Sequence, residues 1–182
     1  MDDLVKGLKA GESAAFDRLV RDYGDRIYRF VRRMVGVRWA DDLAQEVLIR
    51  IHRSVGAYEP TGSFDSWLFT IANNLCIDHL RRNRPERRES SFDADEEGDP
   101  HVPDGREGGP VEVLEEREVK EALRRAVLNL PTDQKQVFLM REEAGLSFKE
   151  ISQITNCPLN TALGRMHYAM ENLRKAMKAF RE

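Results

Sequence analysis

Cysteine is scarce in this sequence, which holds only Cys76 and Cys157 among its 182 residues. The two lie far apart, so they form neither a CxxC pair nor the spaced set that builds a disulfide framework. Long apolar runs are also missing. No stretch approaches the roughly 20 residues that cross a bilayer, and the N-terminus lacks the basic start and apolar run of a signal peptide. These absences predict reduced thiols in a cytoplasmic protein that does not insert into a membrane.

The sequence has no excess of positive charge. Charged residues make up 34% of the chain, but the formal net charge is -3. Proteins that coat nucleic acid by bulk attraction are usually basic, so any DNA binding must come from local patches or depend on a partner. Hydrophobic residues account for 41%, enough to form the core of one ordinary domain or of two small ones.

Residues suited to catalysis or metal binding are not grouped in the sequence. His52, His79, His101 and His167 lie in different segments. Cys76 and His79 have a spacing that metal ligands use, but no second pair completes a zinc site, and no glycine-rich phosphate loop is present. We therefore predict no catalytic residues, no metal and no cofactor, and expect that the chain is not an enzyme.

Apolar residues recur at helical spacing through much of the chain. The i, i+3, i+4, i+7 pattern marks one face of each of three segments, 27–35, 43–55 and 67–80. Asp41 and Asp42 precede the second segment, where carboxylates favour the positive end of a helix dipole. No alternating, strand-like segment of useful length is present. The pattern predicts an all-α fold.

A segment rich in proline and acidic residues divides the chain. Between residues 85 and 111 apolar residues are sparse, and prolines accompany the acidic run of residues 93–99. Such a segment cannot bury enough surface to offset the entropy lost on ordering. We predict a flexible acidic linker over 85–111 that joins two small helical domains, 1–84 and 112–182. About 25 residues span roughly 80 Å when extended, so the domains need not touch.

The C-terminal segment has the order of a helix-turn-helix. Ser147 and Glu150 have capping-box spacing at the start of a short helix, and Asn156-Cys157-Pro158 then forms a tight turn before a long last helix. In a helix-turn-helix the second helix enters the major groove. The alternative is an ordinary helical hairpin whose apolar stripe is core. The candidates for DNA contact are Lys149, Asn160, Thr161, Arg165, His167 and Tyr168.

Two long segments resemble the extracytoplasmic-function (ECF) RNA polymerase sigma factors of the sigma-70 family. Their region 2 is similar to DDLAQEVLIRIHRSVGAYEPTGSFDSWLFTIANNLCIDHLRR, and their region 4 is similar to LPTDQKQVFLMREEAGLSFKEISQITNCPLNTALGRMHYAMENLRK. The resemblance implies a region 2 helical bundle and a region 4 helix-turn-helix in an alternative sigma factor. Such a protein binds core RNA polymerase and directs promoter-specific initiation through the -10 and -35 elements. The implied partners are the β′ clamp and β flap of the polymerase, promoter DNA and an anti-sigma protein.

The resemblance also implies roles for individual residues. Polymerase binding is implied for Asp42, Leu43, Gln45, Glu46 and Val47, for which the alternative is a solvated helix face. Capture of -10 bases is implied for Tyr58, Phe64, Trp67, Thr70, Asn73, Asn74, Arg81 and Arg82. Aromatic rings suit stacking on bases, although Phe64 and Trp67 are stronger candidates for the core than Tyr58. Binding of the -35 element is implied for the helix-turn-helix candidates.

The chain departs from the family pattern at several expected DNA contacts. Many relatives carry basic residues where this chain has Thr70, Asn73, Leu163 and Tyr168, and a serine in place of Gly164. We therefore expect Arg165 and His167 to contribute more of the -35 recognition. The acidic linker is expected either to enter the basic RNA path of the polymerase, as the resemblance implies, or to be a solvated connection.

Two other functions fit the same helices. A helix-turn-helix regulator that acts without polymerase would bind duplex DNA alone and tightly, with a steep salt dependence, which the net charge of -3 disfavours. A helical protein–protein adaptor would bind another helix and show no DNA binding even with polymerase present. A pull-down with core polymerase separates these functions.

Overall fold

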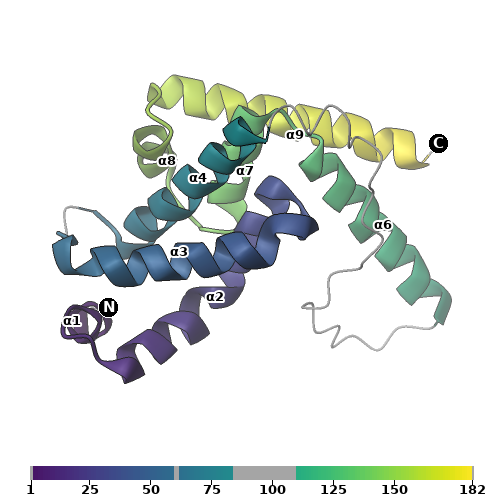
Figure 1. Cartoon of the computed structure of the whole chain (residues 1–182). Coiled ribbons are helices and arrows are strands. Elements are labelled where there is room, and N and C mark those ends of the chain that lie inside the picture. Colours follow the sequence, from purple (N-terminus) through teal and green to yellow (C-terminus); the bar gives the residue numbers. More distant parts are fainter. Residues whose placement is uncertain (1, 60–61, 84–109, 182) are drawn as a thin grey trace.

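The computed structural model describes residues 2–59, 62–83 and 110–181, and the regular secondary structure in these ranges is helical (Figure 1), which confirms the all-α class. The N-terminal lobe contains α1 (Asp2–Lys9), α2 (Ser13–Val35), α3 (Ala40–Ser54) and α4 (Phe64–Arg82), with 3-10 turns at Val37–Trp39 and Val55–Ala57. The C-terminal lobe contains α6 (Pro110–Leu128), α7 (Thr132–Glu142), α8 (Phe148–Ile154) and α9 (Leu159–Arg181). The predicted linker, 85–111, lies outside the described residues except for its last two, which begin α6.

The N-terminal lobe packs the apolar faces of α2, α3 and α4 around one core. α2 buries Ile27 and Phe30, α3 buries Ile51, and α4 buries Phe69. The rings of Phe30 and Phe69 meet edge-on, with centroids 5.4 Å apart. Burial of each of these side chains contributes roughly 1.5–3 kcal/mol. These are the faces that the spacing of apolar residues predicts.

Helix α1 is not among the predicted elements, yet it packs on α2 and buries Leu4 and Leu8. The two helices approach closely at Gly7, where an added Cβ would lie 2.7 Å from the Cβ of Ala15. Glycine is therefore required at this position. The sequence does carry a signal for α1, because leucines four residues apart lie on the same face of a helix.

The C-terminal lobe is built on α9, which packs against α6, α7 and α8. The predicted capping box is confirmed: Ser147 Oγ accepts a hydrogen bond from Glu150 N (3.3 Å), and Glu150 Oε2 accepts one from Ser147 N (2.9 Å). Gly145 has a φ of 65° and turns the chain from α7 toward α8. Left-handed backbone of this kind favours glycine.

The two lobes lie against each other (Figure 1). α2 lies beside α6 and α7, and α4 lies beside α8. Buried side chains of both lobes form one connected hydrophobic cluster. Linker length predicts only that the lobes need not touch, and their contact depends on side chains distant in sequence, which no local pattern reveals.

Candidate functional site

The outward side of α3 carries most of the predicted polymerase-binding residues. Asp42 and Gln45 are exposed, and Glu46 is half-buried, with its carboxylate 2.8 Å from Arg50 Nε. Ile49 lies one turn further along and is 36% exposed. Sequence analysis missed Ile49, although its spacing from Gln45 and Glu46 places it on the same side of the helix. We call the surface of Asp42, Gln45, Glu46 and Ile49 the α3 face.

Leu43 and Val47 do not share this exposure. Leu43 is half-buried, and Val47 is fully buried in the N-terminal lobe. The prediction that Val47 contacts a partner directly is therefore corrected. Its side chain packs in the hydrophobic core and holds α3 against the rest of the lobe. The sequence holds the signal for this, since Val47 shares a helix face with buried Ile51.

Aromatic rings cluster where α4 begins. The ring centroid of Tyr58 lies 4.9 Å from that of Trp67 and 5.6 Å from that of Phe64, and the Phe64 and Trp67 centroids are 5.5 Å apart. Tyr58 and Phe64 are buried, whereas Trp67 is half-buried. Sequence analysis favours Tyr58 over Trp67 as the ring available to a base. The structure reverses this order, because Tyr58 packs inward against both neighbouring rings.

The other predicted -10 contacts on α4 differ in exposure. Asn74, Arg81 and Arg82 are exposed. Thr70 is half-buried, and its hydroxyl donates to the Ser66 carbonyl oxygen (2.7 Å), a common local partner for threonine in a helix. Asn74 is therefore the α4 amide that is accessible in this arrangement.

Asn73 is covered by the other lobe. Its side chain is buried, and its Oδ1 accepts a hydrogen bond from Gln136 Nε2 of α7 (2.9 Å). The amide group predicted to contact a -10 base is thus occupied by the C-terminal lobe. Contact between Asn73 and DNA requires α7 to move away from α4.

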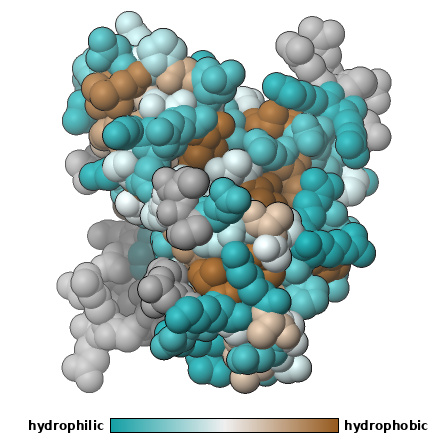
Figure 2. Space-filling model, turned by 90° about the vertical axis from the view of Figure 1, so that its left-hand side faces the viewer, coloured by the Kyte–Doolittle hydropathy of each residue, from teal (hydrophilic) through white to brown (hydrophobic). Residues whose placement is uncertain are grey.

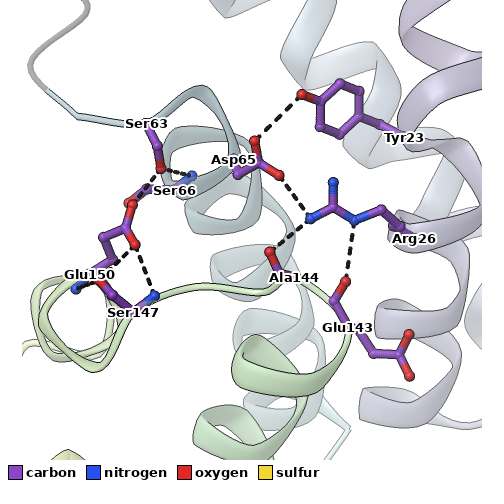
Figure 3. A network of polar contacts seen from close by, with 9 residues as sticks. All are labelled: Tyr23, Arg26, Ser63, Asp65, Ser66, Glu143, Ala144, Ser147 and Glu150. Carbon is purple, nitrogen blue, oxygen red and sulfur yellow. Dashed lines mark hydrogen bonds and ion pairs between the residues drawn. The ribbon is translucent and has the colours of Figure 1, made fainter.

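A polar network joins the lobes at the C-terminal end of α7 (Figure 3). Arg26 of α2 donates from Nη2 to the carbonyl oxygen of Ala144 (2.7 Å) and from Nε to that of Glu143 (3.3 Å). The same guanidinium pairs with Asp65 Oδ1 (2.8 Å), and Asp65 Oδ2 accepts a hydrogen bond from Tyr23 (3.5 Å). Carbonyl groups at a helix C-terminus lack partners within the helix, so Arg26 satisfies them from the other lobe.

The side chain of Glu143 adds ion pairs to this interface. The side chain is 9% exposed, and its carboxylate lies 3.0 Å from Arg29 Nε and also pairs with Arg33 Nη1. The two arginine side chains are 33% and 36% exposed, so solvent partly screens the pairs. These ion pairs offset the free-energy cost of burying the Glu143 carboxylate, because a buried charge without a partner is strongly unfavourable.

A second polar contact joins Ser63, at the start of α4, to Glu150 in the first turn of α8. The Ser63 hydroxyl donates to Glu150 Oε1 (Figure 3). This hydrogen bond is the largest cause of a lowered pKa of Glu150. The N–H and hydroxyl of Ser147 lower the pKa further, against desolvation, which raises it. The interface therefore favours the ionised carboxylate.

We expect Ser63→Ala to raise the pKa of Glu150 toward its ordinary value, because the carboxylate loses the hydroxyl that favours its ionised form. In the wild type the lowered pKa contributes stability that is present above the ordinary carboxyl pKa. This stability is lost as the pH falls through the lower folded-state value. NMR titration of the Glu150 side chain measures the shift. Ser152→Ala is the control, since the Ser152 hydroxyl donates to the Lys149 carbonyl (2.7 Å), and equal Glu150 pKa values in both variants contradict the contact.

α8, the turn after it and α9 have the helix-turn-helix order that the sequence predicts. Exposed side chains on α8 and the first half of α9 include Lys149, Asn160, Thr161, His167 and Tyr168. Arg165 differs, because it is half-buried and its Nε lies 3.2 Å from Asp133 Oδ2 of α7. A contact between Arg165 and a base therefore competes with an ion pair that joins α9 to α7.

Metal-binding clusters and membrane-spanning helices are absent from the described ranges. No group of three or more His, Cys, Asp or Glu side chains there is placed to hold a metal ion. None of the described helices is both long enough and apolar enough to cross a membrane. Burial raises the pKa of the Cys76 thiol to about 12, so the nucleophilic thiolate does not form near neutral pH.

Known proteins match the chain over both lobes. Residues 19–86 match Sigma-70 region 2, and residues 120–173 match Sigma-70, region 4. The ECF RNA polymerase sigma factor SigW of Bacillus subtilis is 32% identical over 96% of this chain and 95% of its own. The RNA polymerase sigma-H factor of Pseudomonas aeruginosa is 31% identical over 96% and 92% of the two chains. A similar fold, with TM-score 0.68, 19% identity and coverage of 90% and 96%, occurs in the sigma factor RpoE from Bartonella quintana, solved with the anti-sigma factor NepR.

Proposed function

This chain belongs to the ECF sigma factors of the sigma-70 family, and we propose how its surfaces divide the work of an alternative sigma factor. Such a protein binds core RNA polymerase and directs transcription initiation, and it is not an enzyme. One observation supports this assignment of surfaces: the predicted contact residues that are exposed lie in three separate places. These are the α3 face, the side of α4 that carries Asn74, and the start of α9.

The α3 face is assigned to the β′ clamp of core polymerase. Asp42 and Glu46 supply negative charge, Gln45 supplies an amide, and Ile49 supplies exposed apolar area. Complementary charge sets the orientation and rate of encounter, whereas a desolvated apolar contact stabilises the complex. A basic helical partner with an apolar stripe fits this surface.

The exposed side of α4 and the adjoining aromatic cluster are assigned to the -10 element. The amide of Asn74 offers a donor and an acceptor, the pair that recognises adenine edges. Arg81 and Arg82 are exposed, and their guanidinium groups can neutralise phosphates. Trp67 is the half-buried ring of the cluster, so a flipped base stacks there in preference to buried Tyr58.

The start of α9 is assigned to the -35 element, with Lys149 of α8 as a phosphate contact. Asn160, Thr161, His167 and Tyr168 are exposed where the second helix of a helix-turn-helix meets base edges. Residues 1–84 then serve as region 2, and residues 112–182 serve as region 4, which also binds the β flap. For residues 85–111 we keep two alternatives: the segment enters the RNA path of the polymerase, or it is a solvated connection.

Promoter binding requires the lobes to separate. The centres of the -10 and -35 elements lie roughly 80 Å apart along B-form DNA, which rises 3.4 Å per base pair. In this structure α4 contacts α8, and Gln136 covers Asn73. One chain therefore cannot hold both elements while its lobes are docked, and we infer that binding to polymerase draws them apart. An extended linker of about 25 residues has the necessary reach.

Asn74→Ala is expected to weaken capture of the -10 strand by about tenfold, because a lost amide–base contact costs about 1–3 kcal/mol. The measurement is binding of the holoenzyme to a fork-junction promoter with a single-stranded -10 segment. The same holoenzyme with a duplex that carries only the -35 element is the internal control, where no change is expected. Equal losses on both probes, or no loss on the fork, contradict the assignment of Asn74.

An anti-sigma protein and a cytoplasmic location complete the proposal. The sigma factor RpoE, which shares this fold, was solved with an anti-sigma factor. Exposed apolar side chains such as Leu159 and Phe180 offer area to a protein partner. The cytoplasm is the compartment in which bacterial RNA polymerase transcribes.

In vitro transcription with core polymerase on templates randomised upstream of the start site tests the function. Specific transcripts are expected, and output equal to that of core polymerase alone contradicts it.

A further inference from the structure

The fold of the C-terminal lobe does not require glycine at position 164. An added Cβ would meet no heavy atom within 4 Å, and Gly164 is not among the described glycines with positive φ. It nevertheless lies well inside the 23 residues of α9, where glycine is less favourable than every residue except proline. Gly7 is the contrast, because an added Cβ there would lie 2.7 Å from Ala15. Neither packing nor backbone conformation within the lobe therefore accounts for glycine at this position.

Gly164 lies in the middle of the outward side of α9. The buried residues Ala162 and Leu173 mark the opposite side. Asn160 precedes Gly164 by four residues and Tyr168 follows it by four, so the three form one row along the helix. Both neighbours in the row are exposed, Tyr168 by 58%. Because Gly164 has no side chain, the row has a gap at which a ligand can approach the helix backbone.

Leu163 directly precedes Gly164, is turned about 100° around the helix from it, and is 43% exposed. Leu159 lies one turn earlier on the same side and is 46% exposed. The molecular surface at the end where α8 and the start of α9 lie is largely hydrophilic, with separate apolar patches (Figure 2). Single exposed leucines are common on protein surfaces, so Leu163 is informative only through its place beside Gly164. We call the bare helix backbone at Gly164, with Leu163 on its flank, the apolar notch.

We propose that this notch recognises thymine in the -35 element, with Gly164 letting α9 approach the base pairs closely and Leu163 contacting the thymine methyl group. The inference rests on the proposed placement of α9 in the -35 major groove. That groove displays the 5-methyl group of thymine, and apolar side chains are its chemical partners. The N-terminal residues of a recognition helix are the ones that meet base edges, and the notch lies in this part of α9.

The test uses holoenzyme and a promoter duplex selected by the wild type from a randomised -35 segment. Each selected thymine is replaced in turn by deoxyuridine, which removes only the methyl group. At one position the wild type is expected to lose about fourfold in affinity, the value of one buried methyl group. Leu163→Ala is expected to bind the thymine and deoxyuridine duplexes equally at that position. Equal sensitivity of wild type and Leu163→Ala at every position overturns the inference.

Gly164→Ala gives a second readout, in which stability and binding change in opposite directions. The melting temperature of the chain is expected to rise by about 2–4 °C, because alanine favours the helix. Affinity for the selected -35 duplex is expected to fall about fivefold or more, because the added methyl group fills the notch. Gly24→Ala in α2 is the control: its Cβ would lie 3.6 Å from Val20 Cγ1, an ordinary contact. It is expected to raise the melting temperature with no change in -35 affinity.

Asn160→Ala separates failure of this inference from failure of the proposed function. If Asn160→Ala weakens -35 binding while Gly164→Ala and Leu163→Ala do not, α9 lies in the groove and the notch does not recognise thymine. If none of the three variants changes -35 binding, the placement of α9 is wrong as well. The second result is also the one expected if this surface binds a protein in place of DNA.

Discussion

Asp42→Arg is expected to weaken binding to core polymerase by about a hundredfold or more. Asp42 is an exposed carboxylate on the α3 face, beside Gln45 and Glu46. Removing one partner of a charge pair at the centre of an interface costs about 2–5 kcal/mol, and each 1.4 kcal/mol is tenfold in affinity. The reversed charge adds repulsion from a basic partner. Titration of fluorescently labelled chain with core polymerase measures the effect.

Asp41→Arg is the matched control for this variant. Asp41 is also exposed and lies in the same first turn of α3. Both variants therefore lose the same favourable interaction with the helix dipole, about 0.3–1 kcal/mol. Asp41 is turned about 100° around the helix from Asp42 and away from Glu46, but it lies four residues before Gln45 and so borders the α3 face. We therefore expect Asp41→Arg to lose several-fold less affinity than Asp42→Arg. Asp17→Arg, at an exposed position of α2, makes the same change of net charge away from α3 and is expected to bind core polymerase like the wild type. A loss in Asp17→Arg equal to that in Asp42→Arg would show that net charge, not the α3 face, determines binding.

Glu143→Arg is expected to separate the two lobes of the free chain. The variant loses the pairs with Arg29 and Arg33 and adds a positive charge beside them. Loss of a buried partner and like-charge repulsion together cost about 3 kcal/mol, reduced by the partial exposure of the arginines. Small-angle X-ray scattering of the full chain is expected to give a larger radius of gyration. The free chain is also expected to bind single-stranded -10 DNA more tightly, because Gln136 no longer covers Asn73.

Two further variants separate this effect from a general change in charge. Glu142→Arg makes the same substitution at an exposed neighbour and is expected to leave the radius of gyration unchanged. The double variant Arg29→Glu with Glu143→Arg restores an opposite-charge pair and is expected to return part of the compaction. A radius of gyration that is the same in wild type and Glu143→Arg contradicts the role of Glu143 in docking.

Local patterns in the sequence predict the helices and their caps. The Ser147–Glu150 capping box is confirmed because both partners lie within one helical turn and need no tertiary contact. At Val47 the periodicity and the family resemblance give different predictions. Its spacing from Ile51 indicates burial, whereas the resemblance implies a contact with polymerase. The structure shows a buried side chain. When a side chain is apolar and in register with the core, its periodicity is the better guide to exposure.

Contacts between the lobes are beyond prediction from local patterns. Arg26 resembles any other arginine of α2 in the sequence, yet it donates to carbonyl oxygens of the other lobe. Asn73 and Asn74 are adjacent and chemically identical, but Asn73 is buried against Gln136 and Asn74 is exposed. These differences arise from tertiary packing, which decides which predicted DNA contacts are available before the lobes separate.

Footprinting on a selected promoter measures most directly whether promoter recognition by this chain depends on core polymerase. With core polymerase, the wild-type chain is expected to protect the -10 and -35 elements together. At the same salt concentration the free chain is expected to protect neither, and Asp42→Arg with core polymerase is expected to behave like the free chain. Protection of both elements by the free chain, or by Asp42→Arg as strongly as by the wild type, would contradict this dependence.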